Sequence, residues 1–269
     1  MNIENRNYQK IIEGFKIQLN VIRALYYREL LTRITKIKFG LLGIFIEPLG
    51  GVIVWLVLIG YRRGFKPILS LDLVIFLVIG NLTYQLFSQI ARRSVDAIQA
   101  NEALFYYRNV KPVDTIISRS IVEINSYGIV YLVTILGYYF IFNKWRLDNL
   151  PLVFISFLCA AIVAAGLGLI FMIAGHRYIL VKQIVSIVFR PLYFVSGAFF
   201  PLVTLPQWLK PLLSWNPLLQ AIEIGRKGFS DDYLLDPLIS LSYLLQITFI
   251  ILTIGLFIYI KNERILLTR

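Results

Sequence analysis

The sequence predicts an all-α integral membrane protein: six transmembrane helices, an N-terminal amphipathic interfacial helix, and short re-entrant or periplasmic helices before the last span. Of its 269 residues, 58% are hydrophobic and 16% are charged, which is more apolar surface than a soluble domain of this length buries. The apolar residues come in blocks of about 20, the helix length that crosses a bilayer core. We therefore expect one transmembrane domain, residues 40–269, behind an N-terminal segment, residues 1–39.

Residues 1–39 have the pattern of an amphipathic helix and not of a span. Apolar side chains recur there at helical spacing on one face, and charged or amide side chains lie off that face. A basic helix of this kind is expected to lie flat at the membrane surface. The alternative is an ordinary helix packed on a cytoplasmic partner. The apolar positions are Tyr8, Ile11, Ile12, Phe15, Leu19, Ile22 and Tyr26.

Six apolar blocks follow, and each is long enough for a transmembrane helix. A seventh apolar stretch, residues 198–236, contains four prolines that exclude a straight helix, so we expect short re-entrant or interfacial helices there. Its Trp208 and Trp215 belong to a residue type that favours membrane interfaces. The six predicted spans are roughly 40–60, 71–90, 117–142, 151–174, 179–197 and 238–260.

The distribution of Lys and Arg predicts the orientation. With the N-terminus inside, the cytoplasmic segments carry 18 of these residues and the external segments carry 8. Because cytoplasmic loops are enriched in bases, both termini are expected in the cytoplasm. The net charge of +12 then indicates contact with anionic membrane lipids and not with nucleic acid.

The sequence lacks the motifs of a catalytic or nucleotide-binding site. No Gly-Lys dipeptide occurs, which excludes a P-loop, and Gly166-x-Gly168 lies in an apolar block, where glycines serve helix packing. The single His176 excludes a histidine-cluster metal site, and the single Cys159 excludes an intrachain disulfide. We expect a transport subunit without enzymatic activity, catalytic residues, metal or bound cofactor. If transport is active, ATP and Mg²⁺ are held by a separate ATP-hydrolysing subunit.

The cytoplasmic segment 91–115 is the best candidate for docking such a subunit. Arg92, Arg93, Asp96 and Glu102 are typical of a solvated helix of mixed charge, and the aromatic run 105–107 follows them. Aromatic side chains inserted into a partner's cleft often dominate an interface. From the residues alone, a solvated loop whose aromatic rings rest on lipid head groups is an equally good interpretation.

Three stretches in register resemble the type-2 ABC transporter permeases, and most closely those that export capsular polysaccharide. Residues 103–123 resemble the segment after the second span of these exporters, and Leu42-Gly43 with Glu47-Pro48-Leu49 is similar to their first-span motif. At Gln220 the sequence departs from the family signature, in which a histidine is common. The signature appears here as Ser196-Gly197-x-Phe199-Phe200-Pro201, Leu205-Pro206-x-Trp208-Leu209, Asn216-Pro217-Leu218, Glu223 and Arg226.

The resemblance implies a homodimer in the inner membrane with two ATP-binding cassette subunits, and a path at the dimer interface for an anionic lipid-linked polysaccharide. Whether periplasmic export proteins are further partners stays open at this point. It implies that residues near 96–110 form a coupling helix that contacts the ATPase. It also implies that short helices within 198–236 form an external gate. The coupling candidates are Asp96, Asn101, Glu102, Phe105, Tyr106, Tyr107 and Arg108.

Charged residues within apolar blocks and aromatic residues near the gate are the candidates for the translocation path. A charge at a helix centre costs about 2.5–3.5 kcal/mol, so such residues usually face protein or water. Glu47 fits an internal ion pair or the dimer seam, and Arg190 fits an ion pair, an acidic polysaccharide or a lipid phosphate. Aromatic rings suit the C–H faces of sugars. The candidates are Glu47, Arg190, Tyr193, Phe199, Phe200, Trp208 and Trp215.

Other functions stay open at this point. The same architecture serves permeases that export O-antigen, teichoic acid or a drug. An ATP-independent carrier or channel predicts inverted repeats, and no convincing pair of matching halves is found. A membrane-embedded glycosyl- or acyltransferase needs a cluster of histidines and carboxylates that a single histidine does not supply.

Overall fold

The computed structural model describes residues 3–36, 42–143 and 147–267, and within these ranges a few side chains lie outside the description. The described residues form α-helices and short 3₁₀ turns and no strand, which confirms the all-α class. The long helices are α1 (Ile3–Lys36), α2 (Leu42–Arg63), α3 (Leu73–Ser94), α5 (Pro112–Phe142), α6 (Leu150–Arg177), α7 (Ile179–Val195) and α10 (Leu241–Leu267). The short ones are α4 (Ala97–Ala100), η1 (Glu102–Tyr106), η2 (Leu202–Thr204), α8 (Lys210–Ser214) and α9 (Pro217–Phe229).

Within the described residues, four helices are long and apolar enough to cross a membrane: α3, α5, α6 and α10. Helix α2 has a shorter apolar stretch, Pro48–Arg62, and α7 is only 17 residues long. Each predicted span nevertheless coincides with one helix, because an apolar block bounded by polar or proline residues specifies a helix locally. The number of membrane crossings stays a prediction.

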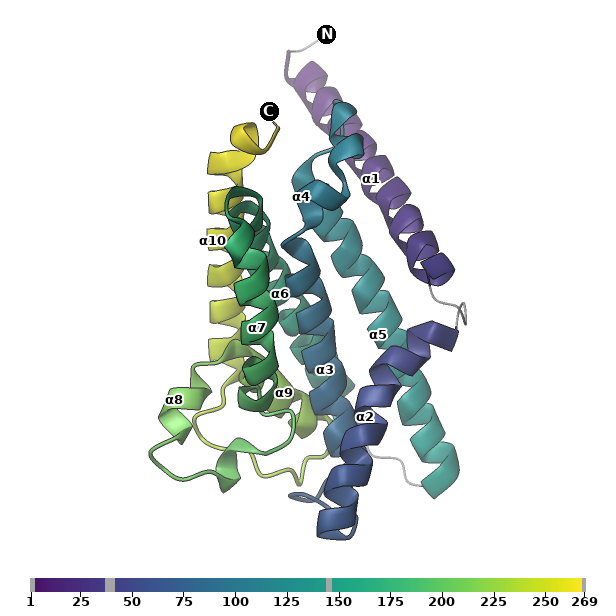
Figure 1. Ribbon diagram of the computed structural model, residues 1–269, viewed down its shortest axis with the longest axis vertical. Coiled ribbons are helices and arrows are strands. Elements are labelled where there is room, and N and C mark those ends of the chain that lie inside the picture. The colour runs from purple at the N-terminus through teal and green to yellow at the C-terminus, as the bar shows by residue number, and fades with distance from the viewer. Residues whose placement is uncertain (1–2, 37–41, 144–146, 268–269) are drawn as a thin grey trace.

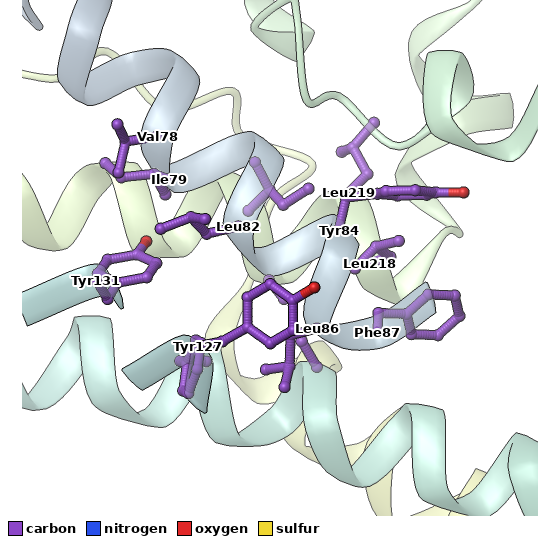
Figure 2. Close-up of a cluster of buried hydrophobic side chains, with 14 of the residues drawn as sticks. Val78, Ile79, Leu82, Tyr84, Leu86, Phe87, Tyr127, Tyr131, Leu218 and Leu219 are labelled. Atoms are coloured by element: carbon purple, nitrogen blue, oxygen red, sulfur yellow. The ribbon is translucent and has the colours of Figure 1, made fainter. Parts of the chain in front are cut away.

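Helix α3 lies at the centre of the bundle and contacts α2, α5, α6, α7 and α9 (Figure 1). Its apolar side chains are almost wholly buried, and Figure 2 shows Leu82 and Leu86 among Tyr127 and Tyr131 of α5 and Leu218 of α9. Helices α5 and α10, by contrast, keep large apolar side chains exposed along their outer faces. Such faces are expected where helices contact lipid.

Glycines on α6 and α10 allow close helix contacts in the bundle. A Cβ at Gly255 of α10 would lie 2.4 Å from the carbonyl oxygen of Gly166, and one at Gly168 would lie 2.6 Å from Ser94 Oγ of α3. Small residues at such crossings let two backbones approach, the usual device of membrane helix pairs. The predicted packing role of Gly166-x-Gly168 is confirmed.

The start of α1, the end of α10 and helix α4 lie at one end of the molecule, and α8 and α9 lie at the other (Figure 1). The predicted coupling segment and the predicted gate segment therefore occupy opposite ends. Which end faces the cytoplasm stays a prediction, supported by the distribution of Lys and Arg.

Helix α1 lies against α5 and has a second, exposed apolar face. Leu25 is buried, whereas Ile12, Phe15 and Leu19 of the predicted apolar face are exposed. The side chains of Tyr8 and Ile11 lie outside the described part. Exposed apolar side chains on a helix that is otherwise attached to the bundle suit a position at the membrane surface. The interfacial position stays a prediction.

Candidate functional site

The predicted coupling segment begins in the last turn of α3 and is not one continuous helix. Helix α3 runs to Ser94, the single turn α4 follows, and the 3₁₀ turn η1 carries the aromatic run. Asn101 joins the two turns, because its buried side chain donates to the carbonyl of Ala97 (2.8 Å) and accepts a hydrogen bond from Arg28 of α1. A polar residue held from two sides fixes the segment against α1.

The seven coupling candidates divide into inward and outward groups. Phe105 is half-buried and packs on a small buried cluster that includes Ile98, Ile116 and Met172. Asn101 also points inward. Tyr106 and Tyr107, by contrast, are 77% and 68% exposed. The remaining candidates Asp96, Glu102 and Arg108 are exposed, and Asp96 pairs with Lys182 of α7 at 2.6 Å.

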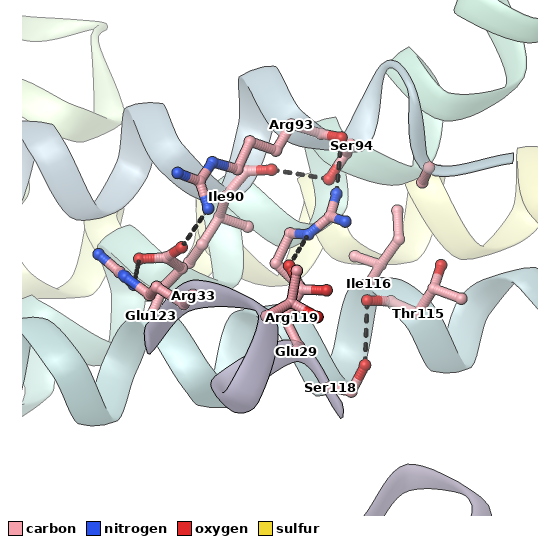
Figure 3. A network of polar contacts seen from close by, with 12 residues as sticks. Glu29, Arg33, Ile90, Arg93, Ser94, Thr115, Ile116, Ser118, Arg119 and Glu123 are labelled. Atoms are coloured by element: carbon pink, nitrogen blue, oxygen red, sulfur yellow. Dashed lines mark hydrogen bonds and ion pairs between the residues drawn. The ribbon is translucent and has the colours of Figure 1, made fainter. Parts of the chain in front are cut away.

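A buried ionic network holds α1, α3 and α5 together beside this segment (Figure 3). The Glu123 carboxylate accepts from Arg33 (2.5 Å) and from Arg93 (3.3 Å), and it is almost completely buried. Arg119 donates to Glu29 (3.2 Å) and to the carbonyl of Arg93 (2.6 Å). Sequence reasoning missed this network, although charged residues in the first turns of the third apolar block were a signal for partners from another helix.

A polar cavity of about 340 Å³ lies between α2, α3 and α7. Asn81, Gln85, Gln89 and Arg92 of α3 line it. These positions are four, four and three residues apart, so they form one stripe along the helix. The amide of Gln85 donates to the carbonyl of Pro48 in α2 at 3.2 Å. The stripe was visible in the sequence and was not recognised.

Aromatic rings that line the cavity contact Phe199 of the predicted gate segment. The ring centroid of Phe199 lies 4.0 Å from that of Trp55 and 4.5 Å from that of Tyr193. The ring centroids of Tyr193 and Tyr84 lie 4.4 Å apart. Tyr193 also donates a hydrogen bond to Asn81. The structure thus brings together two of the predicted path residues, Tyr193 and Phe199. Nothing in the sequence distinguished Trp55 and Tyr84 from other aromatic residues in spans.

The other predicted path residues are placed differently. Arg190 is exposed and lines the same cavity. Phe200 is half-buried within the predicted gate segment. Trp208 and Trp215 are exposed and lie outside the aromatic cluster. Glu47 belongs to α2, but its side chain is not among those that the structure describes. Its predicted role stays a prediction.

A fully buried ion pair lies in α9, within the predicted gate segment. Arg226 and Glu223 of α9 lie 2.9 Å apart, and neither side chain is exposed. The Arg226 guanidinium also donates to the carbonyls of Ala198 (2.9 Å) and Phe200 (3.3 Å), and its Cζ lies 3.5 Å from the centre of the Phe76 ring. One side chain therefore ties α9 to α3 and to the 198–200 loop. The sequence signature contained both charged residues, but it did not indicate this arrangement.

The surroundings of this ion pair explain the glycine at position 80 and the tyrosine at position 233. A Cβ at Gly80 of α3 would lie 2.4 Å from the Ala198 carbonyl and 2.8 Å from Arg226 Nη2, so only glycine fits there. Tyr233 donates to Glu223 at 3.2 Å. Burial raises the pKa of the Glu223 carboxyl above its ordinary value, and the Arg226 charge opposes that rise.

Gln220, the departure from the family signature, has a structural role here. Its amide nitrogen donates to the carbonyls of Ser214 (2.8 Å) and Leu238 (3.0 Å), and its amide oxygen accepts from the Ser240 backbone nitrogen (2.9 Å). It therefore joins α9 to the segments on either side. Within the described part of the chain, no group of three or more His, Cys, Asp or Glu residues is placed to hold a metal ion.

Comparisons with known proteins place the sequence in a family of membrane transporters. The family described as ABC-2 type transporter matches residues 20–230. The chain is 34% identical over 255 residues to the polysialic acid transport protein KpsM of Escherichia coli, covering 95% of this chain and 98% of that one. It is 30% identical over 224 residues to the capsule polysaccharide export inner-membrane protein CtrC of Neisseria meningitidis serogroup A, covering 82% and 83%. The Haemophilus influenzae protein BexB, with the same description as CtrC, is 27% identical over 220 residues, covering 82% and 83%. The chain belongs to the family of ABC-2 type transporter permeases.

Proposed function

We propose that this chain is the transmembrane subunit of an ATP-driven exporter that moves a lipid-linked capsular polysaccharide across the inner membrane. It works as a homodimer with two ATP-binding cassette subunits, six spans in each copy and both termini in the cytoplasm. ATP binding draws the two nucleotide subunits together, and the 91–115 segment passes that motion to the spans.

The observation that carries the proposal is the polar cavity between α2, α3 and α7. Amide side chains such as Asn81 and Gln85 offer both donors and acceptors, as sugar hydroxyl groups require. The rings of Trp55 and Tyr193 offer faces for sugar C–H groups. Amides, aromatic rings and arginines inside an otherwise apolar bundle suit a hydrated, acidic carbohydrate better than a lipophilic drug.

The dimer is supported by the incomplete enclosure of this cavity. Helices α2 and α7 flank it and keep apolar residues exposed, among them Val54, Val57, Ile187 and Val188. A second copy related by two-fold symmetry would bring an identical polar surface opposite the first and cover apolar surface on both. Six helices alone hardly surround a hydrated sugar chain.

Reconstituted transport tests the proposal. The permease is inserted into proteoliposomes with its ATP-binding subunit, and translocation of lipid-linked acidic polysaccharide is measured with and without Mg·ATP. We expect transport only with ATP, and none when the P-loop lysine of the partner is replaced. Cells that lack the chain are expected to lose surface polysaccharide and to keep it inside.

Other cargoes give different results in the same assay. Transport of O-antigen, teichoic acid or a drug in place of acidic polysaccharide would agree with the proposed architecture but would refute the proposed cargo. Transport by the permease without a nucleotide-hydrolysing partner would indicate a carrier or channel and refute the mechanism.

A further inference from the structure

A second polar cleft, of about 400 Å³, opens between the end of α3 and the start of α7. Basic residues dominate its lining: Arg92 and Arg93 come from α3 and Lys182 from α7, whereas Asp96 is its one acidic lining residue among those described. Gln89 and Ser186 add neutral hydrogen-bonding groups. The cleft lies at the same end of the molecule as the coupling segment.

Two of the three basic side chains are already engaged. Arg93 pairs with Glu123 at 3.3 Å, and Lys182 pairs with Asp96 at 2.6 Å. For the Arg92 guanidinium, the described part of the chain provides neither an ion pair nor a hydrogen bond, and the side chain is exposed. Arg92 thus supplies positive charge that the protein itself does not neutralise.

Arg92 and Gln89 also line the 340 Å³ cavity with the aromatic rings, so they stand where the two spaces meet. That cavity contains a second arginine, Arg190, and no acidic residue among its described lining residues. Low-dielectric walls strengthen the field of such charges and attract anions. An arginine offers a planar, forked set of donors that matches a carboxylate or a phosphate.

We propose that the α3–α7 cleft is an anion-binding site in which Arg92 and Gln89 hold a carboxylate or phosphate group of the cargo. The cargo passes from this cleft into the polar cavity between α2, α3 and α7. The inference rests on the proposed function and adds to it the group of the cargo that is recognised. Two sources share this chemistry: the acidic sugars of the polysaccharide and the phosphate of its lipid anchor.

Binding to the assembled permease–ATPase complex in nanodiscs of neutral lipid tests the site. One probe is a sialic acid hexamer, with its carboxyl-reduced form as a neutral match. The other probe is dihexanoylphosphatidylglycerol. We expect Arg92→Gln to raise the Kd of a recognised anion roughly tenfold or more, because a charge-assisted bond is lost. Arg92→Lys keeps the charge and is expected to retain part of the affinity.

Arg62→Gln is the matched control, because Arg62 is an exposed arginine at the far end of α2. It is expected to leave both Kd values unchanged. A loss confined to the hexamer assigns the site to sugar carboxylates, and a loss confined to the phospholipid assigns it to phosphate. Unchanged binding of both probes in Arg92→Gln, or no binding to the unaltered complex, would overturn the site.

Transport by the same variants separates this inference from the proposed function. If the unaltered complex exports with ATP and Arg92→Gln exports equally well at low cargo concentration, the anion site fails and the exporter stands. If the unaltered complex does not export with ATP, the proposed function itself fails.

Discussion

The two ends of this permease each contain a buried ionic network, and the networks are built in opposite ways. At the end with the predicted gate segment, Arg226 and Glu223 belong to one helix and fasten neighbouring backbone segments through the guanidinium. At the end with the predicted coupling segment, Glu123 and Arg119 join side chains from three helices. The first arrangement fixes a loop in place. The second ties α1, α3 and α5 together, which suits the proposed transmission of motion from the coupling segment.

Loss of Arg226 is expected to have the largest effect on stability, because its ion pair with Glu223 is fully buried. Arg226→Met leaves the Glu223 carboxylate buried without its cation, which costs about 3–5 kcal/mol of unfolding free energy. Thermal unfolding in detergent micelles measures the loss. The paired variant Arg226→Met with Glu223→Leu removes both charges and is expected to recover part of it. Equal stability of the single variant and the unaltered chain would contradict a locked gate end.

Glu123→Gln tests the coupling end and is expected to be less severe. The substitution weakens the contacts to Arg33 and Arg93, but Arg93 is already partly solvated, so the loss is about 2–3 kcal/mol. Export should fall further than stability, because the substitution weakens the ionic contact that joins α1 to α3 through α5, while the other α1–α5 contacts remain. Glu13→Gln, at an exposed glutamate of α1, is the control and is expected to change neither. Export that falls no further than the folded fraction would contradict a role in transmission.

The inward and outward sides of the coupling segment give a sharper contrast. Tyr106→Ala is expected to weaken binding of the ATP-binding subunit about tenfold, since exposed aromatics often anchor interfaces, without changing unfolding. Phe105→Ala removes packing and is expected to lower stability by about 1–2 kcal/mol. Co-purification and thermal unfolding of both variants distinguish the two roles.

Tyr61→Ala, at an exposed tyrosine of the opposite end, controls for a general effect of losing a surface ring. Unchanged co-purification of Tyr106→Ala would move the ATPase contact to another surface.

Tyr193→Phe is expected to have the smallest effect. It removes the hydrogen bond to Asn81 but keeps the ring beside Phe199, so stability falls by about 0.5–1.5 kcal/mol and export changes little. Tyr193→Ala also removes the ring and is expected to reduce export strongly. Equal export by the two variants would show that the ring is not part of the path.

Local sequence patterns predicted the helices but only part of the site. Apolar blocks located the long helices, because the pattern that specifies a helix lies within a single segment of the chain. Helix α5 begins at Pro112, five residues before the predicted third span, and Asp114 caps its first turn by accepting from the Lys111 backbone nitrogen. Asp114 and Arg119 are buried and contact Gln18 and Glu29 of α1, which lie 96 and 90 residues away in the chain.

The site depends on pairings between distant segments, and the sequence does not show these directly. Tyr193 and Phe199 were expected near the gate, but their contacts with Trp55 and Asn81 come from two other helices. The stripe that includes Asn81, Gln85 and Gln89 was detectable at helical spacing within the second apolar block. Attention to polar residues inside spans, as well as to charges, would have found it.

Solvent labelling of the α2–α3–α7 cavity tests the central claim most directly. Because Cys159 is the single, buried cysteine, a Cys159→Ser chain gives a clean background for Gln85→Cys in the cavity and Phe249→Cys on the exposed face of α10. We expect a membrane-impermeant maleimide to label Gln85→Cys at a rate that changes with Mg·ATP and falls when polysaccharide is present, and to leave Phe249→Cys unlabelled in the bilayer. A Gln85→Cys that stays unlabelled in every nucleotide state, or that labels at one rate whatever the nucleotide and cargo, would contradict the account.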